Sequence, residues 1–389
     1  MKNEIAAVLA EIVHAGLEGK SIQHLDEHIN FDMLLDIAKE QKMMVILLKP
    51  LLNADNITEE QRKAIKSICM YSFMASANQL REVKLLEKLF EENGLKYQFL
   101  KGSLLKNIYP NPDLRDMGDI DVLVDVNEIK DIDKVLRANN YSEARSIEHH
   151  DVYTKLPNIV LEVHRYLSED KHLNIERKYF DEKSNNRLIE GRKYGYEYSV
   201  EEFYVFMLMH MARHFYERGC GIRGLVDIYV YKKAYGSLIN KKLLNESLER
   251  FGINDFEKHM SKLTDIWLGD SKWDDFYSGI FDYMYEGGIY GKEGNGIWSQ
   301  YAREKQVKNN FFTKIKLKIW YLFPSYSYMA NYNPWLRGKP YLLPFSWVYR
   351  ALKSSDKHVY RQNMTDNTDA QTIYEMQKMY KAMNFKFTE

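Results

Sequence analysis

The chain has 389 residues, which favours two or three domains, and its 45% apolar and 28% charged residues exclude a wholly disordered protein. Lysine and arginine together number 55, as do aspartate and glutamate, so the formal net charge is zero. This balance argues against a broad nucleic-acid-binding surface. The two cysteines, Cys69 and Cys220, are too few for a disulfide framework or a cysteine-rich zinc site and are typical of a reducing cytoplasm.

The N-terminal segment is predicted to be an amphipathic helix and not a signal peptide, because Glu4 and Glu11 flank and interrupt its apolar stretch. Farther along, Thr58 and Gln61 have the spacing of a capping box at the start of a long helix, and Asn93-Gly94 is a typical helix end. We therefore expect a helical region over residues 1–94.

Residues 95–199 are predicted to form a separate core, because short apolar strands alternate there with helical patterns. This order favours a small mixed sheet with helices, and hence an α+β fold embedded in a largely helical chain. The expected strands are Leu95–Leu100, Ile120–Val126, Val152–Leu156 and Ile159–Arg165, and the expected helices are Leu104–Tyr109 and Glu128–Asn139.

Residues 200–389 are predicted to be helical and rich in tyrosine, with helices over Val200–Tyr216 and Gly224–Ala234 and two or three more within 241–286. The glycine-rich stretch Gly287–Gly296 lacks the Lys-Ser/Thr ending of a phosphate loop and is interpreted as a flexible loop. No run of 18 apolar residues predicts a transmembrane helix. Phe311–Leu322 has three lysines among apolar residues, which indicates a surface helix, with a peripheral membrane contact as the alternative.

Asp119 and Asp121 are the most informative residues, because they lie two positions apart at a predicted strand. Side chains alternate along a strand, so both carboxylates project from one face while Ile120 and Val122 face a core. A solvated strand face is the ordinary interpretation of such a pair. Two carboxylates on one face also suit Mg²⁺, and two such ions would hold a triphosphate and activate an attacking oxygen.

Two further segments support the metal interpretation. Gly102-Ser103 follows a strand, where exposed backbone N–H groups and the start of a helix would face phosphate oxygens. Glu162 is the best candidate for a third carboxylate, and it shares a strand face with His164, which would be either a ligand or a group that orients a carboxylate. Asp116 and Asp125 are the competing candidates for the third acid.

The pattern formed by Lys101-Gly-Ser103, Asp119-x-Asp121 and an acid on a later strand resembles the DNA polymerase beta-like nucleotidyltransferase superfamily. The longer pattern, with Arg115 before the acids, Glu162-Val-His164, His210, His214, Arg223-Gly-Leu-Val-Asp227 and Leu342-Leu-Pro344, is similar to an uncharacterised bacterial nucleotidyltransferase family found near surface-polysaccharide and peptide-biosynthesis genes. One departure is a longer loop through Asn111–Met117.

The resemblance implies transfer of a nucleoside monophosphate from an NTP such as ATP to a hydroxyl group, with release of pyrophosphate. Asp119, Asp121 and Glu162 would be the catalytic residues and the ligands of two Mg²⁺ ions. The acceptor would be a small molecule such as a sugar or glycan precursor. Nucleotidylation of a protein side chain and a silent nucleotide-binding regulatory module remain the alternatives. The residues expected to contact the nucleotide are Lys101, Gly102, Ser103, Arg115, Arg213, His214 and Arg223.

The histidine pair His210 and His214 has the spacing of a zinc protease helix, but Met211 occupies the position where that chemistry needs a glutamate. We expect instead that this helix and the next, which carries Arg223, form a second wall of the nucleotide site. The alternative for Arg223 is an ion pair with Asp227, four residues along the same helix.

Overall fold

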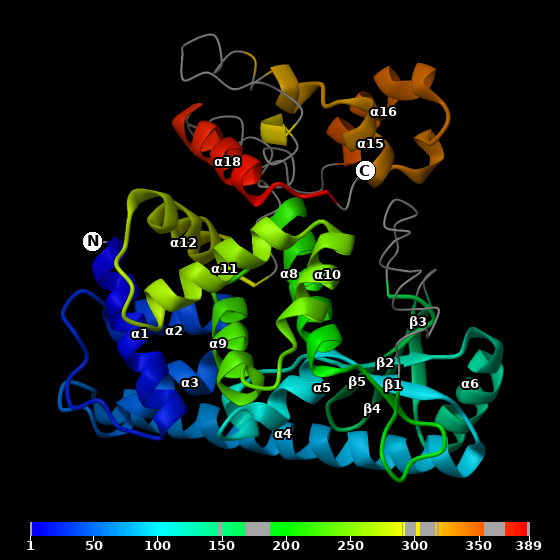
Figure 1. Ribbon diagram of the computed structural model, residues 1–389, viewed down its shortest axis with the longest axis horizontal. Helices are drawn as coiled ribbons and strands as arrows, with labels where there is room; N and C mark the ends of the chain where they lie inside the picture. Colours follow the sequence, from blue (N-terminus) through cyan, green and yellow to red (C-terminus); the bar gives the residue numbers. More distant parts are fainter. Residues whose placement is uncertain are drawn as a thin grey trace. The chain divides into compact units, whose positions relative to one another are not determined.

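The structure is a computed structural model that describes residues 2–146, 150–167, 187–289, 291, 301–303, 316, 319–353 and 370–386 (Figure 1). The chain forms two compact units. The first comprises residues 1–210, 222–273 and 386–389, and the second comprises residues 211–221 and 274–385. The three-part division expected from the sequence remains a prediction, and the two units are described here one at a time.

The N-terminal part of the first unit is helical, as the sequence predicted. It contains α1 (Lys2–Glu18), α2 (Phe31–Glu40) and α3 (Met44–Leu48), and a 3₁₀ turn follows at Lys49–Asn53. The side chain of Asn30 caps α2 by accepting a hydrogen bond from the Met33 amide, which satisfies one of the unpaired N–H groups at the helix start.

Helix α4 (Glu59–Asn93) is the long helix that the capping signals predicted. The Thr58 hydroxyl accepts from the Gln61 amide and the Gln61 side chain accepts from the Thr58 amide, so the capping box is present. At the other end, Gly94 adopts a left-handed conformation with φ of 69°. Figure 1 shows α4 running from the N-terminal helices to the sheet, and it contacts both α3 and a strand of the sheet.

The predicted α+β fold is confirmed by a five-stranded mixed sheet with the order β1-β2-β5-β4-β3. The central pair β2 and β5 is parallel, and the other neighbours are antiparallel. Strand β3 was not predicted, because all five of its residues are exposed and show no apolar alternation. The strands are β1 (Tyr97–Phe99), β2 (Ile120–Val124), β3 (Ser142–Ser146), β4 (His150–Lys155) and β5 (Ile159–His164).

One face of this sheet is apolar and is covered by α4 and by α6 (Ile129–Ala138). Residues at alternate positions of β2 and β5 point into this core, as the strand pattern predicted. The opposite face is therefore the one that carries the polar side chains of the central strands. The core residues include Leu86, Phe90, Ile120, Val122, Ile132, Leu136, Leu161 and Val163.

The connection between β1 and β2 begins with a short helix, α5 (Lys101–Leu105), and continues through 3₁₀ turns at Lys106–Ile108 and Pro112–Leu114. The sequence placed the start of this helix at Leu104, so the helix begins three residues earlier than predicted. The Lys-Gly-Ser segment is thus the first turn of α5 and not a loop before it.

The other elements that the structure describes in the first unit are helices and a small two-stranded sheet. Helix α9 packs against α11, and α11 is tied to α1 because the Trp267 indole N–H donates to the Ala6 carbonyl at 2.9 Å. These elements are β6 (Arg187–Leu188), β7 (Tyr196–Glu197), the first part of α8 (Val200–Glu217), α9 (Arg223–Tyr235), α10 (Lys241–Phe251) and α11 (Asn254–Trp267).

The second unit contains the end of α8 and a set of helices stabilised by aromatic side chains. The Tyr380 hydroxyl donates to the Phe215 carbonyl at 3.1 Å and lies 3.1 Å from the Tyr283 hydroxyl. Tyr283 and Tyr380 therefore serve this unit as packing residues with a hydrogen-bonding end. Its described helices include α12 (Asp275–Gly287), α15 (Tyr326–Tyr332), α16 (Leu343–Lys353) and α18 (Ala370–Met383).

Among the described residues, no helix combines the length and the apolar character needed to cross a membrane. Most of the Gly287–Gly296 stretch and most of Phe311–Leu322 lie outside the described residues.

Candidate active site

The polar face of the sheet carries two of the three acids that the sequence selected, Asp121 and Glu162, and strand register explains how. In the parallel pair, Asp121 of β2 lies opposite Glu162 of β5. In the antiparallel pair, His150 of β4 lies opposite His164 of β5. Since residues opposite each other in a sheet share a face, these four side chains project on the side away from the apolar core.

Asp121 is buried at the centre of this face and is held by two cationic or hydrogen-bonding groups. Its Oδ1 atom lies 3.1 Å from Lys101 Nζ and accepts a hydrogen bond of 2.9 Å from His164 Nε2. Burial alone would raise the pKa of Asp121, but Lys101 and His164 outweigh it and hold that pKa well below its ordinary value. Asp121 is therefore ionised at neutral pH.

Asp119 immediately precedes β2, and its pKa is shifted in the opposite direction to that of Asp121. Burial, followed by the charges of Asp121 and Glu162, raises the pKa of Asp119 from 3.8 to about 6. The pKa of one acid thus responds to the two others, which places the three predicted carboxylates in one electrostatic environment. Such crowding of like charges is typical of sites that are completed by a cation.

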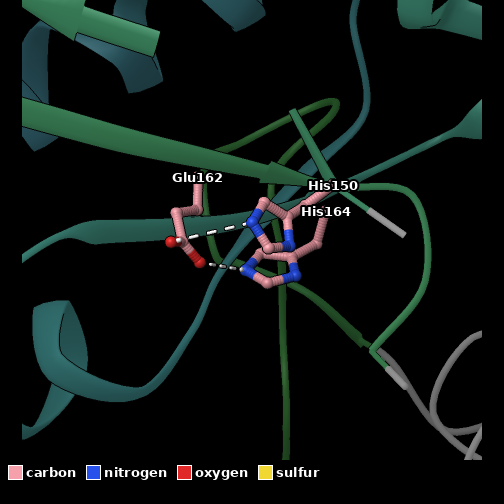
Figure 2. Close-up of side chains that lie close together, drawn as sticks. All are labelled: His150, Glu162 and His164. Atoms are coloured by element: carbon pink, nitrogen blue, oxygen red, sulfur yellow. Dashed lines mark ion pairs between the residues drawn. The ribbon is translucent and has the colours of Figure 1, made fainter. Parts of the chain in front are cut away.

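Glu162 is half-buried, and the neighbouring rings of His150 and His164 both lie on the same side of its carboxylate (Figure 2). One carboxylate oxygen, Oε2, lies 3.4 Å from His164 Nε2, and the other, Oε1, lies 3.7 Å from His150 Nε2. The hydrogen bond from His164 lowers the pKa of Glu162 despite its burial. The histidine at position 150 was missed, because the predicted strand began two residues later; extending the alternation of Val152 back by one step would have found it.

The Lys-Gly-Ser segment lies beside these acids, and its side chains have internal partners. Besides the contact of Lys101 with Asp121, the Ser103 hydroxyl is buried and donates to the Leu100 carbonyl at 2.9 Å. Gly102 is also buried, and a Cβ atom built there would come within 2.9 Å of Met117 side-chain atoms. The structure therefore shows a packing reason for the glycine, while phosphate contacts by Lys101, Gly102 and Ser103 remain a prediction.

We expect Gly102→Ala to lower the free energy of unfolding by about 1–3 kcal/mol, because the added methyl group overpacks the space filled by Met117. Urea denaturation measures this change. In the double variant with Met117→Ala, the loss should be smaller than the sum of the two single losses, since the second change removes the obstructing side chain. A Gly102→Ala protein with the wild-type denaturation midpoint would contradict this packing role.

Arg115 lies in the loop before β2 and is bound to α9 by a buried ion pair. Its Nε and Nη2 atoms donate to the two carboxylate oxygens of Asp227 at 2.7 and 3.0 Å, and Tyr109 adds a hydrogen bond of 2.7 Å to the same carboxylate. The buried Lys106 ammonium donates to the Arg115 carbonyl at 2.8 Å. This network fixes the loop that leads to the carboxylates. A phosphate contact by Arg115 remains a prediction.

The two competitors for the third acid have local roles elsewhere. Asp116 Oδ2 accepts from the Met44 amide at 3.0 Å and so anchors the loop to α3. Asp125 accepts from the Asn127 amide and caps the turn after β2, and its carboxylate lies 3.3 Å from Lys96 Nζ. Glu162, in contrast, is in register with Asp121.

The second wall of the nucleotide site stays a prediction, and of its expected residues Arg223 lies in the first unit. Arg223 begins α9, and its guanidinium is buried and donates to the Asp116 carbonyl at 3.2 Å. Arg223 therefore contacts the loop that precedes Asp119, whereas its neighbour Asp227 pairs with Arg115. Arg213 and His214 belong to the second unit, so their contribution to a nucleotide site stays a prediction.

Comparison with known proteins adds an independent finding. A family model described as an uncharacterised nucleotidyltransferase matches residues 27–269, which is more than half of the chain and includes the polar face of the sheet. No curated protein matches the chain.

Proposed function

This chain belongs to the family of uncharacterised nucleotidyltransferases, and we propose that it transfers a nucleoside monophosphate from an NTP to a hydroxyl group of a small molecule. In this reaction the hydroxyl oxygen attacks the α-phosphorus. A new P–O bond forms, the bond from that phosphorus to the bridging oxygen of the β-phosphate breaks, and pyrophosphate leaves. The hydroxyl proton passes to a base.

The observation that carries the proposal is the pairing of two carboxylates, Asp121 and Glu162, on one sheet face, with Asp119 immediately before β2. Asp121 and Glu162 are opposite each other, and the pKa of Asp119 is raised to about 6 by burial and by those two charges. Carboxylate oxygens are the ligands that Mg²⁺ prefers, and cations would relieve the repulsion among them. Asp119, Asp121 and Glu162 are therefore the residues that would hold Mg²⁺. When bound, such ions would neutralise the triphosphate and favour departure of pyrophosphate.

The chain's own side chains have distinct parts in this proposal. Glu162 remains ionised, because its pKa is lowered by His164, and can accept the proton of the attacking hydroxyl. The Lys101 ammonium lies 3.1 Å from Asp121 and would contact the triphosphate beside these carboxylates. The buried Arg115–Asp227 pair would keep the loop before β2 rigid, so that Asp119 stays beside Asp121.

The acceptor in this proposal is a small hydroxyl compound such as a sugar. The zero net charge supports a small acceptor over a polynucleotide, because nucleic-acid binding depends on clustered positive charge. ATP is the nucleotide to test first, with CTP beside it.

We expect ATP to bind strongly only in the presence of Mg²⁺, and calorimetry with and without a chelator measures this dependence. Asp119→Asn should lose the Mg²⁺-dependent part of the binding. Asp131→Asn is the matched control, because Asp131 is exposed on α6 and should leave binding unchanged. Mass spectrometry of reactions with NTPs and a sugar panel should then detect a nucleotidylated product and pyrophosphate. Equal ATP binding without Mg²⁺ would contradict the metal-dependent reaction.

A further inference from the structure

A second cluster of possible metal ligands lies next to the three carboxylates and has a different chemistry. It consists of His150, Glu162 and His164, whose ligand atoms all lie within 4.8 Å of one another (Figure 2). The two histidines come from adjacent antiparallel strands and lie opposite each other, with ring centroids 5.0 Å apart. Sheet register therefore holds the two imidazoles close together.

The spacing of these atoms suits a single tetrahedral ion. Two ligands about 2.1 Å from a zinc ion at the tetrahedral angle lie about 3.4 Å apart. The separation from Glu162 Oε2 to His164 Nε2 is 3.4 Å, and the separation from the other carboxylate oxygen, Oε1, to His150 Nε2 is 3.7 Å. Side-chain exposures of 12% for His150 and 23% for Glu162 leave the cluster partly open to solvent, whereas His164 is buried at 6%. Small rotations would bring the three donors onto one ion with a fourth position left for water.

The donor set also indicates which ion would bind. Mg²⁺ prefers oxygen ligands in octahedral geometry, which is the chemistry of Asp119, Asp121 and Glu162. Two imidazoles and one carboxylate instead suit Zn²⁺ and related transition ions, and this set is known from catalytic zinc sites.

We propose that His150, Glu162 and His164 form a transition-metal site. Its donors differ from those of the Mg²⁺ site proposed at Asp119, Asp121 and Glu162, but the two sites share Glu162. An ion held by the histidines takes Glu162 away from Asp119 and Asp121. It also takes His164 away from Asp121, with which it now shares a hydrogen bond of 2.9 Å. Provided that the proposed function holds, occupation by Zn²⁺ therefore inhibits Mg²⁺-dependent transfer, and nucleotide chemistry and transition-metal binding compete at one residue.

The site can be tested with metal alone, so the outcome does not depend on the proposed reaction. The full-length, metal-free protein is titrated with Co²⁺, whose visible d–d absorption reports tetrahedral nitrogen and oxygen ligation. We expect one equivalent to bind with this signature. His150→Gln should weaken binding at least about 100-fold, more than the loss of an outer partner of a metal ligand costs. Asp119→Asn should retain the Co²⁺ signal while losing Mg²⁺-dependent ATP binding, which separates the two sites.

Two histidine variants serve as controls for this titration. His24→Gln removes the surface pair of His24 with Asp55, where the separation is 2.6 Å, and should leave the Co²⁺ signal intact. His150→Cys keeps a ligand at the position and should add a thiolate-to-cobalt charge-transfer band. The proposal is overturned if folded His150→Gln binds Co²⁺ like the wild type, if His24→Gln abolishes the signal, or if His150→Cys binds Co²⁺ without the new band.

Discussion

Asp119→Asn is expected to stabilise the metal-free protein at neutral pH by up to about 3 kcal/mol, while it abolishes nucleotidyl transfer. The gain follows from the pKa of Asp119, which burial and the neighbouring carboxylates raise from 3.8 to about 6. Keeping this carboxylate ionised in the folded protein therefore costs free energy, and asparagine removes that cost. Chemical denaturation in the presence of a chelator measures the gain, and a pyrophosphate-release assay measures the loss of activity.

The pH dependence has a definite sign. A carboxyl group whose folded-state pKa is raised destabilises the protein above that pKa, and the cost fades as the pH falls from about 6 to 3.8, where the group takes up a proton in both states. The advantage of Asp119→Asn should thus shrink across this range. An advantage that is independent of pH would show that charge repulsion is not its cause.

Asp121→Asn, only two residues away, should have the opposite effect. Asp121 is paired with Lys101 and with His164, and its pKa is lowered, so its charge contributes stability that is lost as the pH falls below 3.8. Removing this charge should lower the free energy of unfolding by about 2–3 kcal/mol, because two hydrogen bonds to a charged group are weakened. The same denaturation experiment compares the two variants, and stability changes of equal sign would contradict this account of the site.

Asp227→Ala is expected to lower the free energy of unfolding by about 3–5 kcal/mol, because it leaves the buried Arg115 guanidinium without its partner. Tyr109 loses its acceptor in the same variant. Since the network holds the loop before β2, ATP binding should weaken as well. Urea denaturation gives the stability change, and calorimetry with Mg²⁺ and ATP gives the binding change.

The double variant Arg115→Met/Asp227→Leu is the informative control for this pair. Replacing both charges by apolar side chains of similar size removes the uncompensated charge, so most of the lost stability should return. Asp131→Asn, which breaks the exposed pair with Lys134, should change stability by less than about 1 kcal/mol. If the double variant is no more stable than Asp227→Ala, the cost does not come from the buried charge.

Local patterns predicted much of the fold and the acidic part of the site. Alternation along the strands placed Asp121 and Glu162 on faces away from the core, because side-chain direction in a strand depends only on position. Thr58 and Gly94 marked the ends of α4 through capping chemistry that involves neighbouring residues alone.

The remaining contacts depend on packing between distant segments and could not be predicted this way. Asp227 and Arg223 have the spacing of an ion pair within a helix, yet Asp227 pairs with Arg115, which is 112 residues away. The contact of Gly102 with Met117 could not be predicted for the same reason, since only the folded loop brings the two residues together. His150 was missed because its strand was predicted to begin at Val152, so the histidine pair across β4 and β5 was not recognised.

The parallel pairing of β2 with β5 also determines where this chain can tolerate insertions. Asp121 and Glu162 lie opposite each other only in that register. The segment between β2 and β5 must therefore return the chain to the same end of the sheet, so that β5 can run parallel to β2. One extra residue within β5 ahead of Leu161 would turn the Glu162 carboxylate into the apolar core and bring Leu161 to the polar face. An extra residue in the turn between α6 and β3 would leave the register intact. Length variation among related chains is therefore expected in the connections, while the spacing inside these two strands stays constant.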